Sequence, residues 1–243
     1  EVGKRVVDAT YLKTTVPSTH TPNFTVADGM TLRPLNDLPK VAKPADGYVV
    51  VGGGKTGIDA VIWLLENHVD PNDIRWIMPR DGWLLDRGNT QPTDEFFVPT
   101  MNAQAAQFEA IVEATSIPDL FARLEASGVF LRIDPNVQPK MFHGATISQD
   151  ELAELRRVKN IIRMGRVQRI ETDRIVLDDG EIPTSPDVLH VDCSARAVAN
   201  MEMTDVFAED MIRLQTVRTV QPVFSASVIA HVEAKDLSDE AKN

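Results

Sequence analysis

Two apolar runs separated by a glycine-rich turn and a helical stripe dominate the hydrophobic pattern of the chain. Residues 48–51 (YVVV) form a continuous run rich in β-branched side chains, typical of a strand covered on both faces. Residues 52–57 are the glycine-rich turn, and residues 58–68 carry apolar side chains at helical spacing. Residues 74–78 (IRWIM) are a second short apolar run. This order of strand, turn, helix and strand predicts a right-handed βαβ unit.

The rest of the pattern predicts an alternation of helices and short strands. In chain order, it predicts helices over 94–115 and 117–126, a strand over 129–133, a loop over 134–146, a helix over 151–158, a β-meander over 161–182, a strand over 188–192 and a helix over 222–234. Ser148 and Glu151 form a capping box ahead of the third helix. We expect the charged end, 237–243, to fray.

The N-terminal stretch predicts little regular structure. Residues 5–9 (RVVDA) indicate a buried strand, and the following residues up to Pro44 are rich in Pro, Thr and Asn without any period. Such a stretch is typical of an extended connector. The chain also lacks an initiator Met and reaches this strand at once, so we expect it to be a fragment of a longer protein.

Composition narrows the function classes. The 243 residues are 43% hydrophobic and 25% charged, which indicates a soluble globular protein rather than a disordered one. A net charge of −11 argues against binding of nucleic acid through its phosphates. Cys193 is the only cysteine, which excludes an intrachain disulfide and a cysteine-rich zinc site and favours a cytoplasmic setting. No apolar run approaches the roughly 18 residues of a membrane span. No spacing typical of metal ligands occurs, so we predict no metal site. Whether the protein forms a homo-oligomer is left open.

The glycine-rich turn is the motif with the clearest chemistry. Gly52, Gly54 and Gly57 have the spacing G-x-G-x-x-G between a predicted strand and a predicted helix. In dinucleotide-binding folds the first glycine allows the tight turn, the second lets the backbone approach a pyrophosphate, and the third lets helix and strand pack closely. We therefore predict that the turn, Gly52, Gly53, Gly54, Lys55, Thr56 and Gly57, binds a pyrophosphate. The alternative is a glycine-rich turn without a ligand.

The end of the second strand bears on which nicotinamide cofactor would bind. An NAD site usually places an acidic residue there to accept a hydrogen bond from the ribose 2′-hydroxyl. Here Arg80 precedes Asp81, and an arginine can form charge-assisted hydrogen bonds with a 2′-phosphate. We favour NADP(H), while Asp81 could still serve NAD.

These residues resemble a known family. Residues 48–65 (YVVVGGGKTGIDAVIWLL) followed by 74–85 (IRWIMPRDGWLL) look like the nicotinamide-binding domain of flavin-dependent oxidoreductases with two dinucleotide-binding domains, especially the flavin-containing monooxygenase-like branch. In that family, a strand ending in arginine selects NADPH. The meander and the strand after it, residues 166–195, resemble the return to the flavin domain, and residues 5–17 (RVVDATYLKTTVP) resemble the entry from it.

The resemblance implies a fold, a division into domains and further cofactor contacts. The implied fold is α/β, with a Rossmann-like parallel sheet and a β-meander flanked by parts of a flavin-type domain. It divides the chain into a connector and strand over 1–44, a nicotinamide domain over 45–185 and a return with a C-terminal helix over 186–243. It also implies that Thr10, Cys193 and Gln221 lie near FAD. A buried inert cysteine is the alternative for Cys193, and an ordinary helix start is the alternative for Gln221.

The sequence departs from the family in three respects. The family's other glycine motif, which holds the FAD pyrophosphate, is absent, and Tyr11 stands where a glycine is expected. Residues 193–195 (Cys-Ser-Ala) also replace the family's second Ala-Thr-Gly. Either part of the flavin domain is missing from this chain, or the chain works without flavin.

The resemblance implies an NADPH-dependent oxidoreductase that passes hydride to FAD and acts on an unidentified small molecule. His143 is a candidate proton donor, although an ordinary loop histidine is the alternative. Trp83, Asp86 and Arg87 are candidates for the wall of a nicotinamide pocket, and local packing is the alternative. Two other functions stay open: a flavin-free NAD(P)-dependent dehydrogenase, and a non-catalytic module that binds NAD(P)H.

Overall fold

The computed structural model describes residues 4–12, 14–41, 45–91, 93–196, 202–217 and 221–243. They form two compact units, a larger one over residues 20–195 and a smaller one made of residues 1–19 and 196–243. These boundaries differ from the expected ones after residues 44 and 185. The reason is that two strands outside the expected nicotinamide domain, Thr31–Pro34 and Leu189–Asp192, belong to the main sheet of the larger unit.

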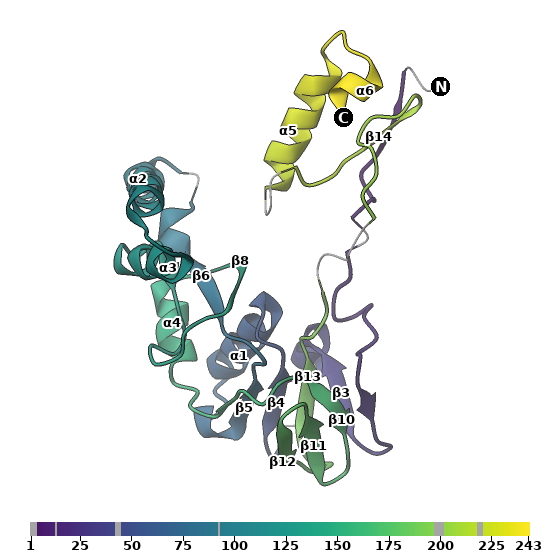
Figure 1. Cartoon of the computed structure of the whole chain (residues 1–243). Coiled ribbons are helices and arrows are strands. Elements are labelled where there is room, and N and C mark those ends of the chain that lie inside the picture. The colour runs from purple at the N-terminus through teal and green to yellow at the C-terminus, as the bar shows by residue number, and fades with distance from the viewer. Residues whose placement is uncertain (1–3, 13, 42–44, 92, 197–201, 218–220) are drawn as a thin grey trace. The chain divides into compact units, whose positions relative to one another are not determined.

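That sheet has five parallel strands and confirms the α/β fold class (Figure 1). In spatial order the strands are β3 (Thr31–Pro34), β13 (Leu189–Asp192), β4 (Tyr48–Val51), β5 (Ile74–Ile77) and β9 (Ile161–Ile162). Val50 of β4 pairs with Val191 on one side and Trp76 on the other. Because all five strands are parallel, their carboxyl ends share one edge, where open α/β sheets bind ligands.

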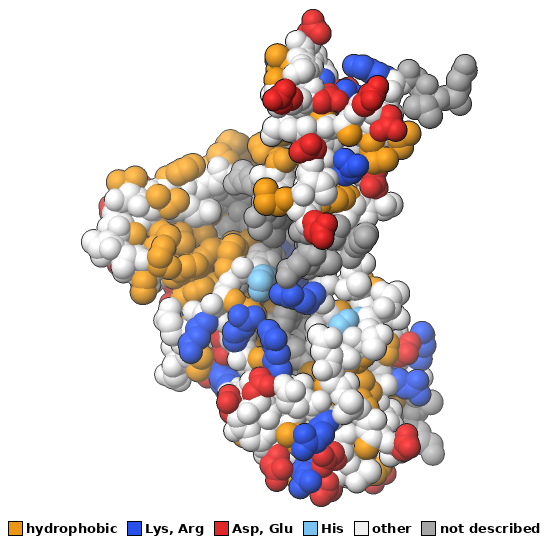
Figure 2. Space-filling view, turned by 45° about the vertical axis from the view of Figure 1, so that its right-hand side comes forward, with side chains coloured by type: hydrophobic (Ala, Val, Ile, Leu, Met, Phe, Trp, Pro, Cys, Tyr) orange, Lys and Arg blue, Asp and Glu red, His pale blue; other side chains and the backbone are white. Residues whose placement is uncertain are grey.

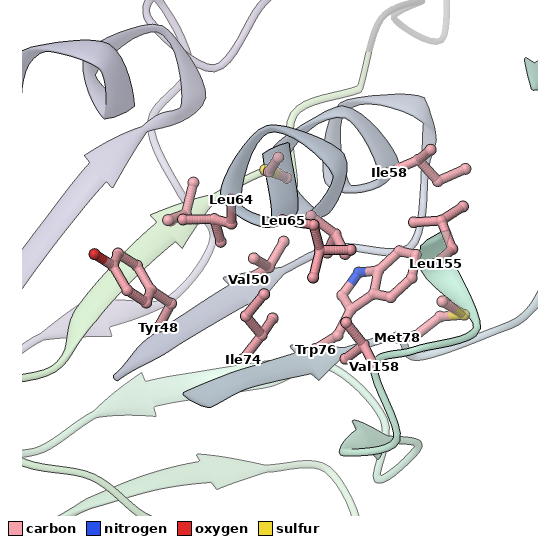
Figure 3. Close-up of a cluster of buried hydrophobic side chains, with 14 of the residues drawn as sticks. Tyr48, Val50, Ile58, Leu64, Leu65, Ile74, Trp76, Met78, Leu155 and Val158 are labelled. Atoms are coloured by element: carbon pink, nitrogen blue, oxygen red, sulfur yellow. The ribbon is translucent and has the colours of Figure 1, made fainter. Parts of the chain in front are cut away.

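Helix α1 (Lys55–Glu66) covers one face of this sheet and completes the predicted βαβ unit. Successive side chains of a strand point to opposite faces, so Val50 packs toward α1 and Val51 toward the other side. Figure 3 shows Val50 and Trp76 of the sheet facing Leu64 of α1, and all three are fully buried. The continuous apolar run of β4 is thus explained by burial on both faces.

The opposite face is covered by the predicted meander. Its strands β10 (Val167–Ile170), β11 (Arg174–Leu177) and β12 (Gly180–Pro183) are antiparallel, and β2 (Thr25–Val26) joins β10 in parallel. Residues 161–162 were predicted as part of the meander, but they form β9 at the edge of the main sheet.

A third sheet, with three strands, follows the βαβ unit. It contains β6 (Gly82–Asp86), β7 (Phe130–Leu131) and β8 (Met141–Ile147), accompanied by α2 (Phe97–Glu113), α3 (Ile117–Ala126) and α4 (Gln149–Leu155). The predicted helices and the capping box of α4 are confirmed. The loop predicted over 134–146 is wrong in its second half. There β8 pairs in parallel with β6, although its glycine and histidine obscure any alternation of apolar residues.

The N-terminal connector is also more ordered than expected. It contains β2, β3 and a 3₁₀ helix (Leu35–Lys40) that buries Leu38, whereas its last residues, 42–44, lie outside the described part. Short edge strands bury few side chains and leave only a weak sequence pattern. The other 3₁₀ helices of the described chain are Pro71–Asp73, Arg87–Asn89 and Asp94–Phe96.

The smaller unit pairs the two ends of the chain. Strand β1 (Val6–Asp8) runs parallel to β14 (Met211–Arg213), accompanied by α5 (Pro222–Glu233) and α6 (Asp239–Lys242). The strand expected over 5–9 exists, but Val7 is 53% exposed rather than buried.

The expected fraying of residues 237–243 is wrong. The amine of Lys242 lies 2.9 Å from the carboxylate of Glu233, and the side chain of Asn243 exchanges two hydrogen bonds with the backbone of Phe207. These contacts, together with the N-cap Ser238, hold α6 in place. The charge pattern had instead predicted a solvent-exposed, frayed end.

Candidate functional site

The glycine turn begins at the carboxyl end of β4, between the ends of β5 and β13. Gly52 has φ +131°, a conformation that side chains with a Cβ rarely adopt. A Cβ at Gly52 would also lie 2.4 Å from the carbonyl oxygen of Cys193, which follows β13. Both the backbone and the neighbouring strand therefore require glycine at this position, as its predicted role in a tight turn demands.

Gly57 allows α1 to approach the sheet. A Cβ at Gly57 would lie 2.0 Å from the carbonyl oxygen of Gly52. The same carbonyl accepts a hydrogen bond of 2.8 Å from the indole nitrogen of Trp76, which is fully buried in β5. Trp76 thus holds the turn in place from within the sheet. The only sequence signal for this role is a tryptophan in an otherwise aliphatic strand next to the motif.

Gly54 differs from these two glycines. Its backbone is extended (φ −87°, ψ −175°), and a Cβ there would meet no atom within 4 Å. It is the N-cap of α1, and no side chain caps this helix end. The first N–H groups of a helix have no partner within the helix. The turn therefore presents uncapped donors and the positive end of the α1 dipole at an open position.

Gly53 packs the turn onto the end of β5. A Cβ at Gly53 would lie 2.5 Å from Cγ of Met78 and 3.3 Å from the carbonyl oxygen of Arg80. The backbone of Arg80 therefore borders the turn.

The charged side chain next to the turn is already paired. Lys55 forms ion pairs with Asp59 and, at 3.8 Å, with Glu151. Burial alone would raise the pKa of Glu151, but the backbone N–H of Ser148 and the cations Arg87 and Lys55 together lower it. Lys55 and Thr56 also present their main-chain N–H groups in the first turn of α1.

Arg80 and Asp81 have different surroundings. Arg80 is exposed and forms no ion pair within the described residues. Asp81 is only 7% exposed, and both of its carboxylate oxygens accept from Arg163, at 2.7 Å from Nε and 3.0 Å from Nη2. These hydrogen bonds are the main reason why the pKa of Arg163 is raised above its ordinary value. Asp81 is therefore not the free acceptor that an NAD-type ribose contact would need.

The other predicted site residues have different surroundings. His143 is exposed and lies on β8 rather than in a loop. Cys193 is buried, and burial raises the pKa of its thiol far above the ordinary value, so it stays protonated at neutral pH. Thr10 and Gln221 belong to the smaller unit. Thr10 hydrogen-bonds the carboxylate of Asp8, and the carbonyl of Gln221 accepts from Ser225 at the start of α5.

The three candidates for a pocket wall contact neighbouring side chains and backbone. Trp83 is 3% exposed, and its ring lies 5.3 Å from that of Phe121. Asp86 accepts hydrogen bonds from the backbone of Gly88 and the side chain of Gln149. Arg87 forms an ion pair with the capping-box residue Glu151. These contacts agree with local packing, and a place in a pocket wall stays a prediction for all three residues.

The described residues contain neither a metal-binding cluster nor a membrane-spanning helix. Across the described ranges, no three His, Cys, Asp or Glu side chains gather in a way that could hold a metal ion. Within the same ranges, no helix combines the length and the apolar character needed to cross a membrane.

A glycine turn at the carboxyl edge of a parallel sheet defines an α/β protein of Rossmann-like architecture. No protein-family model matches the chain. Curated relatives from Mycobacterium tuberculosis (strains H37Rv and CDC 1551) and Mycobacterium bovis are 49% identical over 242 residues, and each carries the name "uncharacterized protein". The match covers 100% of this chain and 45% of each relative, so the chain spans less than half the length of the curated relatives it matches.

Proposed function

We propose that this chain is the NADPH-binding part of a flavin-dependent oxidoreductase, with the turn 52–57 as the pyrophosphate site. Gly54 is the observation that supports this most directly. Gly52 and Gly57 are needed by the fold itself, but a Cβ at position 54 would meet no atom of the described chain within 4 Å. A glycine there keeps the uncapped end of α1 open to the backbone-level approach of a pyrophosphate.

The residues around the turn suit such a ligand. The main-chain N–H groups of Gly54, Lys55 and Thr56 would donate to pyrophosphate oxygens, assisted by the α1 dipole. The guanidinium of Arg80, exposed and without an ion pair in the described chain, would bind the 2′-phosphate in charge-assisted hydrogen bonds. Trp76 would hold the turn rigid through the carbonyl of Gly52.

The chemistry would come from the cofactors, since NADPH supplies a hydride and FAD accepts it. This chain would bind and orient the dinucleotide. FAD is proposed for the whole protein on the resemblance described above. The single G-x-G-x-x-G spacing of this sequence, at the turn, is assigned to NADPH. The smaller unit, which holds Thr10 and Gln221, would belong to the flavin side.

Two rival functions use the same turn. A non-catalytic NADPH-binding module would need only the turn and Arg80, whereas a flavin-free dehydrogenase would need a proton donor, for which His143 is the candidate. Turnover of NADPH by the colourless protein, abolished in His143→Gln, would favour the dehydrogenase. Binding without turnover in a full-length relative that carries no flavin would favour the module.

Calorimetric titration of the chain with NADPH and, separately, NADH tests the proposal. We expect NADPH to bind more tightly. Arg80→Ala should weaken NADPH at least about tenfold and NADH much less, since a charge-assisted contact with phosphate contributes about 1.5–3 kcal/mol. Arg166→Ala is the matched control, because Arg166 is also exposed but lies next to the meander. Equal losses for both nucleotides in Arg80→Ala, or no binding by the wild type, would contradict the proposal.

A further inference from the structure

The carboxyl end of β5 carries two adjacent residues of opposite charge, Arg80 and Asp81. A carboxylate beside a 2′-phosphate is unfavourable, because like charges a few ångströms apart repel each other strongly near a protein surface. Asp81 is also nearly buried. A site for a 2′-phosphate at this strand end therefore requires that the charge of Asp81 be balanced.

Arg163 provides that balance. It follows β9, the strand next to β5, and its guanidinium contacts both oxygens of Asp81, at 2.7 and 3.0 Å. This two-point geometry is the one that an arginine forms best with a carboxylate, and a lysine could not reproduce it. Nη2 of Arg163 also lies 3.3 Å from Asp134, at a more exposed position.

Further positive charge lies close to the pair. The backbone N–H of Lys140 donates to the carbonyl of Asp81 at 3.0 Å, and its exposed side chain forms no ion pair within the described residues. Arg80 and Lys140 therefore lie on the two segments next to the paired carboxylate, one adjacent in sequence and the other hydrogen-bonded through its backbone.

We propose that Arg163 is a specificity-determining positioning residue that selects a 2′-phosphorylated dinucleotide over its unphosphorylated form. By holding both oxygens of Asp81, it removes the acceptor that a free ribose 2′-hydroxyl would use and cancels the charge that would repel a phosphate. This inference rests on the proposed function, and it assigns the preference to a pair of residues that lie 82 positions apart in the sequence.

A cycle of four proteins tests the assignment: the wild type, Asp81→Asn, Arg163→Gln and the double variant. The ratio of the NADH to the NADPH dissociation constant should follow the net charge of the pair. It should be highest in Asp81→Asn (pair charge +1), lowest in Arg163→Gln (−1), and similar in the wild type and the double variant (both 0). Each unit of charge should change the ratio about five- to tenfold, as expected for charges several ångströms apart near a surface.

The recovery of the ratio in the double variant separates this role from a structural one. A pair that only stabilises the fold would lower the affinity for both nucleotides equally and leave the ratio unchanged in all four proteins, which would overturn the inference. If Arg163→Gln fails to fold, Asp81→Asn must still exceed the double variant in this ratio. If the wild type binds neither nucleotide, the proposed function itself fails. If it binds both but the ratio is constant, only the inference fails.

Discussion

Helices α1 and α2 belong to the same unit but use their apolar side chains in opposite ways. The 12 residues of α1 bury Ile58, Val61 and Leu64 completely against the sheet. The 17 residues of α2 bury only two alanines, while Phe108 and Val112 are 68% and 83% exposed. Figure 2 shows hydrophobic side chains spread over the part of the surface that α2 and α3 form.

The comparison shows that apolar content alone does not identify the structural core. The side chains of α1 fill the space above a sheet buried on both faces, and Gly57 brings the helix backbone against the turn. Helix α2 contacts its own small cluster mainly through Ala103 and Ala110, so its larger apolar side chains face solvent. The candidate site is therefore built on the tightly packed helix, which is where a fixed array of donors can be maintained.

Truncating equivalent apolar side chains on the two helices should have very different effects. Leu64→Ala on α1 should lower the free energy of unfolding by about 2–5 kcal/mol, because it opens a cavity in a fully buried cluster. Phe108→Ala on α2 is the matched control, and it should change stability by less than about 0.5 kcal/mol. Urea unfolding followed by circular dichroism measures both. A large loss in Phe108→Ala would show that α2 is packed in solution.

A single added methyl group at Gly57 should disrupt the close approach of α1 to the sheet. In Gly57→Ala the new methyl group would meet the carbonyl of Gly52, so we expect a loss of about 1–3 kcal/mol from overpacking. Thermal unfolding provides the measurement, with Ala105→Gly on the exposed face of α2 as a control for helix propensity. Full stability in Gly57→Ala would mean that the turn and the helix are farther apart than described.

Removing the hydrogen bond between Trp76 and the carbonyl of Gly52 should lower stability by less than Gly57→Ala. Trp76→Phe keeps an aromatic ring in β5 but removes the donor to the carbonyl of Gly52. Because Gly52 is only half-buried, losing this hydrogen bond should cost about 0.5–1.5 kcal/mol. Nucleotide affinity should fall together with stability, since Trp76 holds the turn. Unchanged affinity in a stable Trp76→Phe would rule out the positioning role.

The sheet under α1 should also have a measurable pH dependence. His190 is fully buried in β13 between the hydroxyl of Thr184 and the carbonyl of Thr31. Burial lowers its pKa below the unfolded value of about 6.5. The unfolded state then binds more protons, so stability is complete above about pH 6.5 and decreases as the pH falls below it, by at most about 1.4 kcal/mol per pH unit.

His190→Gln should flatten that slope. Urea unfolding of both proteins at pH 7.5 and 5.5 gives the comparison, and acidic groups with lowered pKa values contribute equally to both. Identical slopes would assign the pH dependence to other groups.

Much of the turn could be predicted from sequence, because the requirements of Gly52 and Gly57 are local. A positive φ and a close helix–strand contact both select glycine, and the flanking apolar runs locate the strand and the helix. Strands β3 and β8 escaped prediction because an edge strand and a strand interrupted by glycine have weak patterns. Arg163 could not be found from local sequence, since its pairing with Asp81 depends on β9 lying beside β5.

The central claim, that the N-terminus of α1 holds the pyrophosphate of NADPH, is tested most directly by Gly54→Asp. The extended backbone and open surroundings of Gly54 accept this side chain, which would cap α1, so stability should be unchanged or slightly higher. Because the carboxylate would occupy and repel the phosphate position, calorimetry should show at least about a hundredfold loss of NADPH affinity. Gln104→Glu on α2 adds the same charge and should bind like the wild type. Equal NADPH affinity in Gly54→Asp and the wild type would contradict the account.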